Sequence, residues 1–334
     1  MKKIGVLFGV ENSFPSALVE RINILTAERA RNAEGIRAEY VLTGATSLDR
    51  APDYAVIIDR ISHDVPFYRA WLKNAALAGT AVVNNPFRAS ADDKFLNYAV
   101  ARQLGVAVPP TALLPHKELP NNTSDKSMRN LEYPLDWESV FAAAGEHGYL
   151  KPINGGGWRD VYEVRGREEF FKAYDRSRDL CMVYQKAVEY TEYFRCYVVG
   201  QKTVRIMRFN PRLPHAERYA QTPARATTFE ARKLFKRMND DAVNLCRALG
   251  YDLNSVEFAV ENGVPYAIDF LNPVPDADVN SVGEANFEWI VEHVAELAIA
   301  RAKAAPRTGE LNGVRLLATG SKSKPSRRTP KKVR

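Results

Sequence analysis

The sequence feature that most constrains this chain is the stretch Y-L-K-P-I-N-G-G-G-W-R-D-V-Y-E-V at residues 149–164. A short apolar run ends at Lys151, three glycines follow at Gly155, Gly156 and Gly157, and a second strand-like run comes after them. Consecutive glycines adopt positive φ without steric cost and expose their backbone N–H groups, and convergent N–H groups bind phosphate oxygens well. The Lys151 ammonium would reach the same phosphates. A flexible hairpin turn beside a surface lysine explains these residues equally well, so the rest of the chain must decide.

The composition describes a globular chain with an electrically neutral body. A length of 334 residues suits two or three domains, and 46% apolar residues supply a sizeable core. The net charge of +7 comes from the tail after residue 320, which holds seven basic residues and no acid; the remainder has 40 basic and 40 acidic residues. This balance argues against a nucleic-acid-binding body and confines any such contact to the tail.

The cysteines and the apolar runs indicate a cytoplasmic protein. Cys181, Cys196 and Cys246 are scattered without C-x-x-C spacing, which favours buried structural thiols in a reducing compartment over a nucleophile. No apolar run approaches the roughly 18 residues of a membrane span. The short run behind the first lysines reads as a strand rather than a signal peptide. We therefore expect no membrane partner, and the sequence leaves a homo-oligomer open.

The first 88 residues predict a parallel α/β domain, because short apolar strands alternate with helical or turn-rich segments. Strands are expected at residues 4–10, 38–42, 54–58 and 80–83, and helices at 13–33 and 66–78. Ser13 followed by Pro15 is typical of a helix start. Ligands gather at the carboxyl ends of parallel strands. Polar residues stand there that either cap and face solvent or contact a substrate: Asn12, Ser13, Asp59, Arg60 and His63.

The rest of the chain predicts two further α/β lobes and a tail. Helices are expected at 91–104 (capped by Ser90), 167–178, 229–249 and 284–304, and strands at 181–185, 193–199, 202–209, 255–261 and 264–271. Residues 115–136 have no period and are expected to form a long loop. Beyond residue 305 the composition is that of a disordered segment. The expected domains are 1–88, 89–187 and 188–305, followed by a disordered basic tail at 306–334.

Single cations on the predicted elements give a further hint. Lys94 stands in the first turn of the helix predicted at 91–104, where the helix dipole favours an acid. A cation placed against that preference hints at an anionic partner. Arg195, Arg205 and Arg208 put cations on predicted strands, where a solvated face is the default explanation.

Two acids on the last predicted hairpin suggest a metal site. Glu257 and Asp269 stand on facing strands with Asn272 three residues on, and carboxylate and amide oxygens suit Mg²⁺. A two-residue Asn-Gly turn would set Glu257 opposite Ile268 and send the two acids to opposite faces. A three-residue loop at 261–263 would set Glu257 opposite Ala267 and keep both acids on one face. The metal hypothesis therefore requires the three-residue loop; the alternative is two unrelated surface acids.

With Lys94, Lys151, the glycines and this hairpin in order, the chain resembles the ATP-grasp superfamily over roughly residues 1–304. It looks most like the branch of the ribosomal-protein glutamate ligases, glutathione synthetase and D-alanine–D-alanine ligase. The resemblance implies an α/β (α+β) fold: an N-terminal parallel α/β domain followed by two α/β lobes that clasp a nucleotide.

The resemblance also implies which residues hold ATP. Lys94 and Lys151 would contact its phosphates, with Gly155, Gly156 and Gly157 as the lid loop. The segment at 183–192 resembles the hinge that reads adenine. In it, side-chain or backbone groups would hold the base and the ribose: Gln185, Lys186, Val188 and Glu192.

The same resemblance implies the metal and catalytic residues. Glu257, Asp269 and Asn272 would hold magnesium, and Arg205 or Arg208 would contact the γ-phosphate and the acyl phosphate, with Lys151 neutralising charge. The family's acid-x-Asn has one extra residue here, which puts Asn272 in question as a ligand. The glycine expected after N-P-x-P is replaced by an acid: Asp276, followed by Asp278. These acids either cap a loop or attract the amine of a second substrate.

The implied reaction is ATP-dependent ligation of a carboxylate to an amine through an acyl phosphate, with release of ADP and phosphate. Small-molecule, amino-acid or peptide-like substrates are expected, with ATP and Mg²⁺. Catalysis would depend on positioning and charge neutralisation rather than on a protein nucleophile. Two alternatives stay open: an ATP-grasp kinase that phosphorylates a small hydroxyl compound, and a non-catalytic nucleotide-binding protein whose basic tail contacts nucleic acid.

Overall fold

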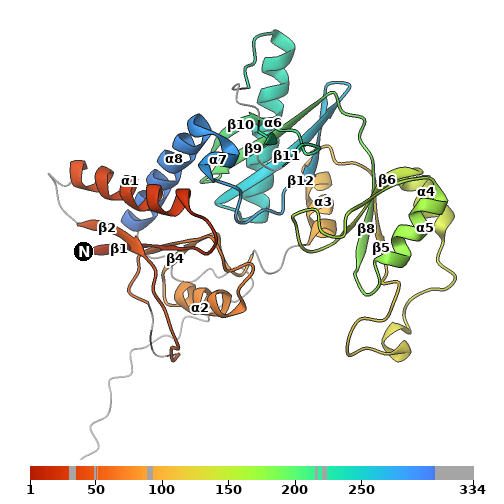
Figure 1. The fold of residues 1–334 in the computed structure, drawn as a ribbon, viewed down its shortest axis with the longest axis horizontal. Coiled ribbons are helices and arrows are strands. Elements are labelled where there is room, and N and C mark those ends of the chain that lie inside the picture. The colour runs from red at the N-terminus through yellow and green to blue at the C-terminus, as the bar shows by residue number, and fades with distance from the viewer. Residues whose placement is uncertain are drawn as a thin grey trace, which may run out of the picture.

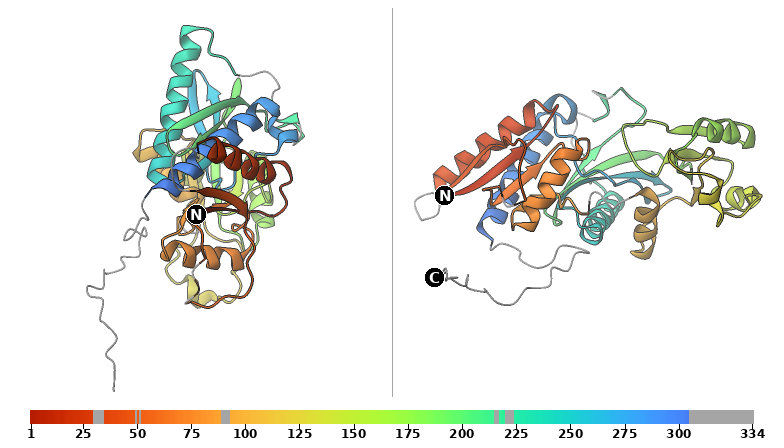
Figure 2. Two further views of the ribbon diagram at one scale, coloured as in Figure 1. Left: turned by 90° about the vertical axis from the view of Figure 1, so that its left-hand side faces the viewer. Right: turned by 90° about the horizontal axis from the view of Figure 1, so that it is seen from below.

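A computed structural model describes residues 1–29, 35–48, 50, 52–88, 93–214, 217–219 and 224–304. The predicted Ser90 cap, residues 30–33 of the first predicted helix and the predicted basic tail lie outside the described residues. The described chain forms three four-stranded sheets. Figures 1 and 2 show the N-terminal unit at one end of an elongated molecule, a second sheet at the other end and a third between them. Within the described residues, no helix is both long and apolar enough to cross a membrane.

The N-terminal unit contains the parallel sheet that the sequence predicted. Its strands are β1 (Lys2–Leu7), β2 (Ile36–Tyr40), β3 (Val56–Asp59) and β4 (Ala81–Val83), in the order β2-β1-β3-β4. Helix α2 (Pro66–Leu77) packs on one face through Trp71 and Leu72. Helix α1 (Ser13–Arg29) packs on the other face together with the last described helix, α8 (Glu284–Lys303). The chain therefore returns to its first sheet before the tail.

The second sheet is antiparallel and lies at the far end of the molecule. Its order is β5-β8-β6-β7, from β5 (Thr111–Leu114), β6 (His147–Pro152), β7 (Tyr162–Arg165) and β8 (Met182–Lys186). Helices α4 (Trp137–Ala144) and α5 (Arg167–Arg176) cover it with an aromatic cluster. The sequence missed β5 and α4, although Asp136 caps α4. The predicted loop at 115–136 is confirmed except for a short 3₁₀ helix, η1 (Asp125–Met128).

The third sheet forms the centre of the molecule. Its order is β10-β9-β11-β12, from β9 (Glu192–Val199), β10 (Thr203–Arg208), β11 (Leu253–Glu261) and β12 (Val264–Asp269). Helices α3 (Lys94–Gln103) and α6 (Phe229–Leu249) pack on one face, and α8 with the short α7 (Val279–Val282) on the other. The predicted bounds of α6 are confirmed. Thr228 caps its start, and Gly250 ends it at φ 78°.

The β11–β12 hairpin corrects the loop expected from the sequence. Asn262 (φ 50°) and Gly263 (φ 75°) form a two-residue turn, and Glu261 pairs with Val264. The three-residue loop was therefore wrong. The register shifts between Phe258, opposite Ala267, and Glu257, opposite Asp269, so Ile268 forms a β-bulge. This extra residue reverses the parity that the turn set. Both carboxylates therefore reach the same side by a route that the local sequence did not indicate.

Candidate functional site

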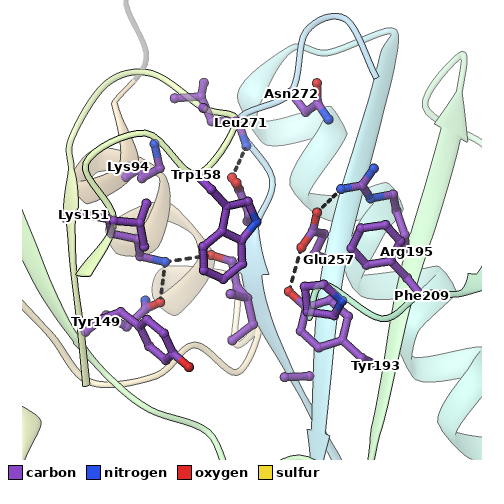
Figure 3. Close-up of a pocket in the computed structure, with 18 of the residues that line it drawn as sticks. Lys94, Tyr149, Lys151, Trp158, Tyr193, Arg195, Phe209, Glu257, Leu271 and Asn272 are labelled. Carbon is purple, nitrogen blue, oxygen red and sulfur yellow. Dashed lines mark hydrogen bonds and ion pairs between the residues drawn. The ribbon is translucent and has the colours of Figure 1, made fainter. Parts of the chain in front are cut away.

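A cavity of about 330 Å³ lies where the second and third sheets meet. Figure 3 shows two of its sides. One side, the lysine wall, carries Lys94 and Lys151, and the opposite side, the Glu257 wall, carries Glu257 and Arg195. Other residues that line the cavity include Tyr149, Gly155, Gly156, Gly157, Trp158, Gln185, Lys186, Val188, Tyr219, Asp269 and Asn272.

The lysine wall brings α3 and β6 together. Lys94 is the first residue of α3, which Asp93 caps, and its backbone N–H donates to the Ile153 carbonyl at 3.0 Å. Its ammonium donates to the Gly155 carbonyl at 2.7 Å, which ties the glycine loop to the helix start. Lys151 lies near the end of β6 and donates to the Gln185 side chain on the adjacent β8 at 2.7 Å. Both ammonium groups are buried, as an anion site requires.

Electrostatics on this wall disfavour charge without a ligand. Burial lowers the pKa of Lys151 to about 8, with nearby Lys94 adding to the shift and Asp269 opposing it. Burial also raises the pKa of Asp269 above its ordinary value, with the Glu257 carboxylate in the same direction and the two lysines opposing. The two lysines therefore repel each other, and so do the carboxylates of Glu257 and Asp269. A ligand that brings anionic oxygens to the lysines and a cation to the acids would relieve both.

The Glu257 wall is held by a buried ion pair. Arg195 on β9 pairs with Glu257 on β11, its neighbour across the two strands. Tyr193 donates to the other Glu257 oxygen at 2.6 Å, and Arg195 donates to the Tyr219 hydroxyl at 2.6 Å. The guanidinium also lies 4.0 Å from the ring centroid of Phe209. Burial alone would lower the pKa of Arg195, but the charge of Glu257 and these hydrogen bonds raise it, so the guanidinium stays charged.

The acids and the amide at this wall fit a hard cation. Glu257 and Asp269 are directly opposite each other, and each oxygen of the Glu257 carboxylate keeps a second lone pair beyond its bond to Arg195 or Tyr193. Asn272 lines the same cavity; its Nδ2 donates to Ser255 at 2.8 Å, and its amide oxygen has no hydrogen bond among the described residues. In the described part of the chain, no three His, Cys, Asp or Glu side chains form a group that could hold a metal ion by themselves. This donor set suits Mg²⁺ that takes its remaining oxygens from a ligand.

The hinge residues expected to read a base are partly in place. Gln185, Lys186 and Val188 line the cavity. Gln185 is fixed between Lys151 and the Thr111 hydroxyl, to which its Nε2 donates at 2.9 Å. Glu192 does not line the cavity, because it begins β9 and pairs with Arg208 at 2.9 Å.

The structure does not bring Arg205 and Arg208 to the cavity. Arg205 donates to Asn286 of α8 at 2.9 Å, and Arg208 stacks over Phe194 at 5.3 Å on the α6 side of the sheet. Their assigned roles stay predictions without support from this geometry. Arg195 occupies the cavity instead. Sequence reasoning could not rank Arg195 above the other arginines, because its partner Glu257 is 62 residues away and only the β9–β11 register joins them.

The acids that follow the hairpin belong to local structure. Asp278 is the N-cap of α7, where it accepts the Asn280 N–H and the Ser13 hydroxyl at 2.9 Å each. Asp276 accepts the Asp278 N–H at 3.1 Å. Neither lines the cavity, so of the two interpretations from the sequence, the capping one fits.

Cations exceed acids around the cavity, which the sequence did not predict. Two carboxylates line it, and one of them is paired with Arg195. Among the described residues, no carboxylate lies within ion-pair distance of six other lining cations: Lys94, Lys151, Arg159, Lys186, Arg212 and Arg218. A concave site with this charge concentrates anionic ligands.

Comparison with known proteins gives the fold. No family model and no curated protein matches the chain. Solved structures do match the chain, among them the three that follow. D-alanine–D-alanine ligase from Bacillus anthracis has a TM-score of 0.61 at 16% identity, covering 90% of this chain and 97% of its own.

The other two structures are similar at the same level. A RimK domain ATP-grasp protein from Sphaerobacter thermophilus has a TM-score of 0.61 at 16% identity over 88% of this chain and 98% of its own. The macrocyclase MdnC from Microcystis aeruginosa MRC, bound with the precursor peptide MdnA, has a TM-score of 0.56 at 14% identity over 90% and 100%. Together with the three sheets and the two walls, these matches show that the chain has the ATP-grasp fold, which the resemblance of its motifs had implied.

Proposed function

We propose that this protein is an ATP-dependent ligase that joins a carboxylate to an amine. A carboxylate oxygen attacks the γ-phosphorus, the bond to the bridging oxygen breaks, and ADP leaves an acyl phosphate. The amine nitrogen then attacks the acyl carbon, phosphate departs, and the nitrogen loses a proton to give the amide. One observation carries the proposal: two lysines, the glycine loop and a facing pair of acids line a single cavity.

The structural neighbours support the choice of nucleotide and metal. The Bacillus anthracis ligase has also been solved complexed with ATP, and the ATP-grasp ligase PsnB with a minimal precursor, Mg and ADP. Both have the fold of this chain at 15–16% identity. PsnB and MdnC were solved with precursor peptides. We infer a small-molecule or peptide-like pair of substrates.

The proposed residue roles follow the two walls. Lys94 and Lys151 hold phosphate oxygens, and the glycine N–H groups cover them. Glu257, Asp269 and Asn272 would hold magnesium, which when bound neutralises the charge that develops on the phosphates. Arg195 holds Glu257 in place through their ion pair and lines the same cavity, where its charge would act on the phosphate oxygens. No side chain acts as a nucleophile, so the rate acceleration comes from position and charge.

The nucleotide base and the chain's organisation are proposed as the sequence predicted them. The base lies against Gln185, Lys186 and Val188, which line the cavity. The domain bounds 1–88, 89–187 and 188–305 and the cytoplasmic location stay predictions. Packing of α8 on the first sheet means that the third unit would not separate cleanly from the first.

An isotope experiment tests the reaction. Candidate amino acids and short peptides labelled with ¹⁸O in the carboxylate are incubated with ATP, Mg²⁺ and an amine. The acyl-phosphate route transfers one ¹⁸O into the released phosphate, which ³¹P NMR resolves. ADP formation that requires a hydroxyl compound, without ¹⁸O transfer, would replace the ligase with the kinase. Nucleotide binding without turnover on any substrate would leave the non-catalytic alternative.

A further inference from the structure

Trp158 is an exposed aromatic residue at the mouth of the cavity. It follows the three glycines, and 51% of its surface is exposed. No described residue makes a ring contact, hydrogen bond or ion pair with its indole. In the view of Figure 3 the ring is drawn between Lys151 and Glu257, and all three residues line the same cavity. A half-exposed tryptophan in this position leaves apolar surface that a ligand in the cavity would cover.

The backbone beneath Trp158 is also unusual. Its φ is 62°, in the left-handed region that bulky residues rarely adopt, and Asp160 has φ 55°. A Cβ added at Gly155, Gly156 or Gly157 would meet no atom within 4 Å, so no neighbour crowds the side-chain positions of these glycines, and the loop contacts Lys94 through the Gly155 carbonyl. Packing within the loop therefore does not explain the conformation. Strain of this kind is concentrated at sites where a ligand completes the structure.

We propose that Trp158 covers the reacting groups of the bound ligand and keeps water away from the acyl phosphate. The inference depends on the proposed function. It assigns a residue to the step at which water could hydrolyse the acyl phosphate before the amine attacks. In the proposed function Lys151 holds the phosphates and Glu257 holds the metal. A ring placed between these two residues would cover the γ-phosphate and the acyl phosphate that forms from it. Excluding water there strengthens the charge interactions and directs the intermediate to the amine rather than to hydrolysis.

A quenching experiment tests the covering contact without any turnover. Trp158→Phe subtracted from wild type isolates the Trp158 fluorescence from that of the other three tryptophans. Acrylamide is the quencher, because it carries no charge that the basic cavity would attract. We expect Mg²⁺ with AMPPNP to lower the quenching constant of this component about threefold or more. An unchanged constant while calorimetry shows bound nucleotide would overturn the inference and leave the ligase proposal intact; absence of nucleotide binding would overturn both.

Product ratios test the chemical consequence. Glycine takes φ 62° without strain, so Trp158→Gly removes the ring and keeps the loop conformation. We expect it to raise the ratio of phosphate released to amide formed about fivefold, and Trp158→Phe to stay within about twofold of wild type. Tyr133→Ala, an exposed aromatic that does not line the cavity, is the matched control. A wild-type ratio in Trp158→Gly would contradict the inference. A wild type that forms no amide would contradict the ligase, and quenching would then decide the role of Trp158.

Discussion

At the scale of single residues, the cavity contains charged side chains whose charged forms are disfavoured by burial, namely Lys151 and Asp269. The charges of Lys94 and Asp269 both act on Lys151, which donates hydrogen bonds to the Gln185 side chain and the Ile268 carbonyl. Its pKa of about 8 means that the proton is held loosely before a ligand arrives. An anionic triphosphate would raise that pKa again, so ligand binding and protonation are coupled.

This coupling predicts a pH dependence of nucleotide affinity. Below pH 8 the free site is already protonated and binding is insensitive to pH. Above pH 8 binding must take up a proton, so the affinity for Mg²⁺–AMPPNP falls by up to about tenfold per pH unit. Lys151→Met should bind weakly and show no such fall, and Lys186→Met, at an exposed position in the same cavity, should retain it. Calorimetry between pH 7 and pH 9.5 makes the measurement. A flat wild-type profile, or a fall that persists in Lys151→Met, contradicts the assignment.

At the scale of elements, one β-bulge determines whether the two acids of the proposed metal site lie on the same face of the sheet. Without the bulge, Ile268 would pair with Glu257, and Asp269 would lie on the opposite face of the sheet from Glu257. The Ile268 carbonyl accepts the Tyr98 hydroxyl from α3 at 2.7 Å and the Lys151 ammonium at 3.5 Å. The helix that carries Lys94 therefore also stabilises the bulge that turns Asp269 inward.

Tyr98→Phe tests this connection. The loss of one buried hydrogen bond should cost about 1–2 kcal/mol of unfolding free energy, because the remaining bond to Ile268 is long. It should also weaken Mg²⁺-dependent ATP binding several-fold, since Asp269 is no longer fixed. Urea unfolding and calorimetry measure both effects. Tyr162→Phe, whose hydroxyl donates to Asp160 at 3.3 Å outside the bulge, is the control. If both variants change Mg²⁺ dependence equally, the bulge does not position the metal ligand.

The sequence predicted the features that depend on local signals and missed those that depend on pairing between distant strands. Helix α6 and the parallel first sheet depend on local signals: an N-cap, a C-terminal Gly250 and short apolar runs. The glycine loop and its two lysines were identified because their residue types carry the chemistry. Arg195 opposite Glu257 and the bulge at Ile268 depend on pairing between distant strands. No periodicity within either strand encodes such a register.

At the scale of the whole molecule, the N-terminal unit holds the far side of the Glu257 wall. Asn84 donates to the Leu253 and Pro273 carbonyls at 2.7 Å each and accepts the Leu253 N–H at 2.8 Å. Arg60, fully buried and paired with Glu11, donates to the Pro275 carbonyl at 2.7 Å. The segment between these contacts and β12 carries Asn272 into the cavity. The N-terminal unit therefore supports the segment that carries the proposed metal ligand Asn272, and neither Asn84 nor Arg60 lines the cavity.

Asn84→Ala should reveal this support. Leaving buried Leu253 and Pro273 groups unpaired should cost about 3 kcal/mol of unfolding free energy and raise the Mg²⁺ concentration needed for ATP binding. A thermal melt and a Mg²⁺ titration at fixed ATP measure the two effects. Asn121→Ala, at an exposed position, serves as the control. Lower stability with an unchanged Mg²⁺ requirement would mean that the first unit holds the fold but not the metal site.

We propose that the two walls converge on one magnesium-bound triphosphate, and a calorimetric titration of ATP measures whether they do. We expect one site per chain with Kd between about 1 μM and 1 mM, the usual range for enzyme substrates. Omission of Mg²⁺, Glu257→Gln and the double variant Lys94→Met/Lys151→Met should each weaken binding about tenfold or more. Equal ATP affinity in all four titrations would contradict the claim, because the lysines and the acids would then not share a ligand.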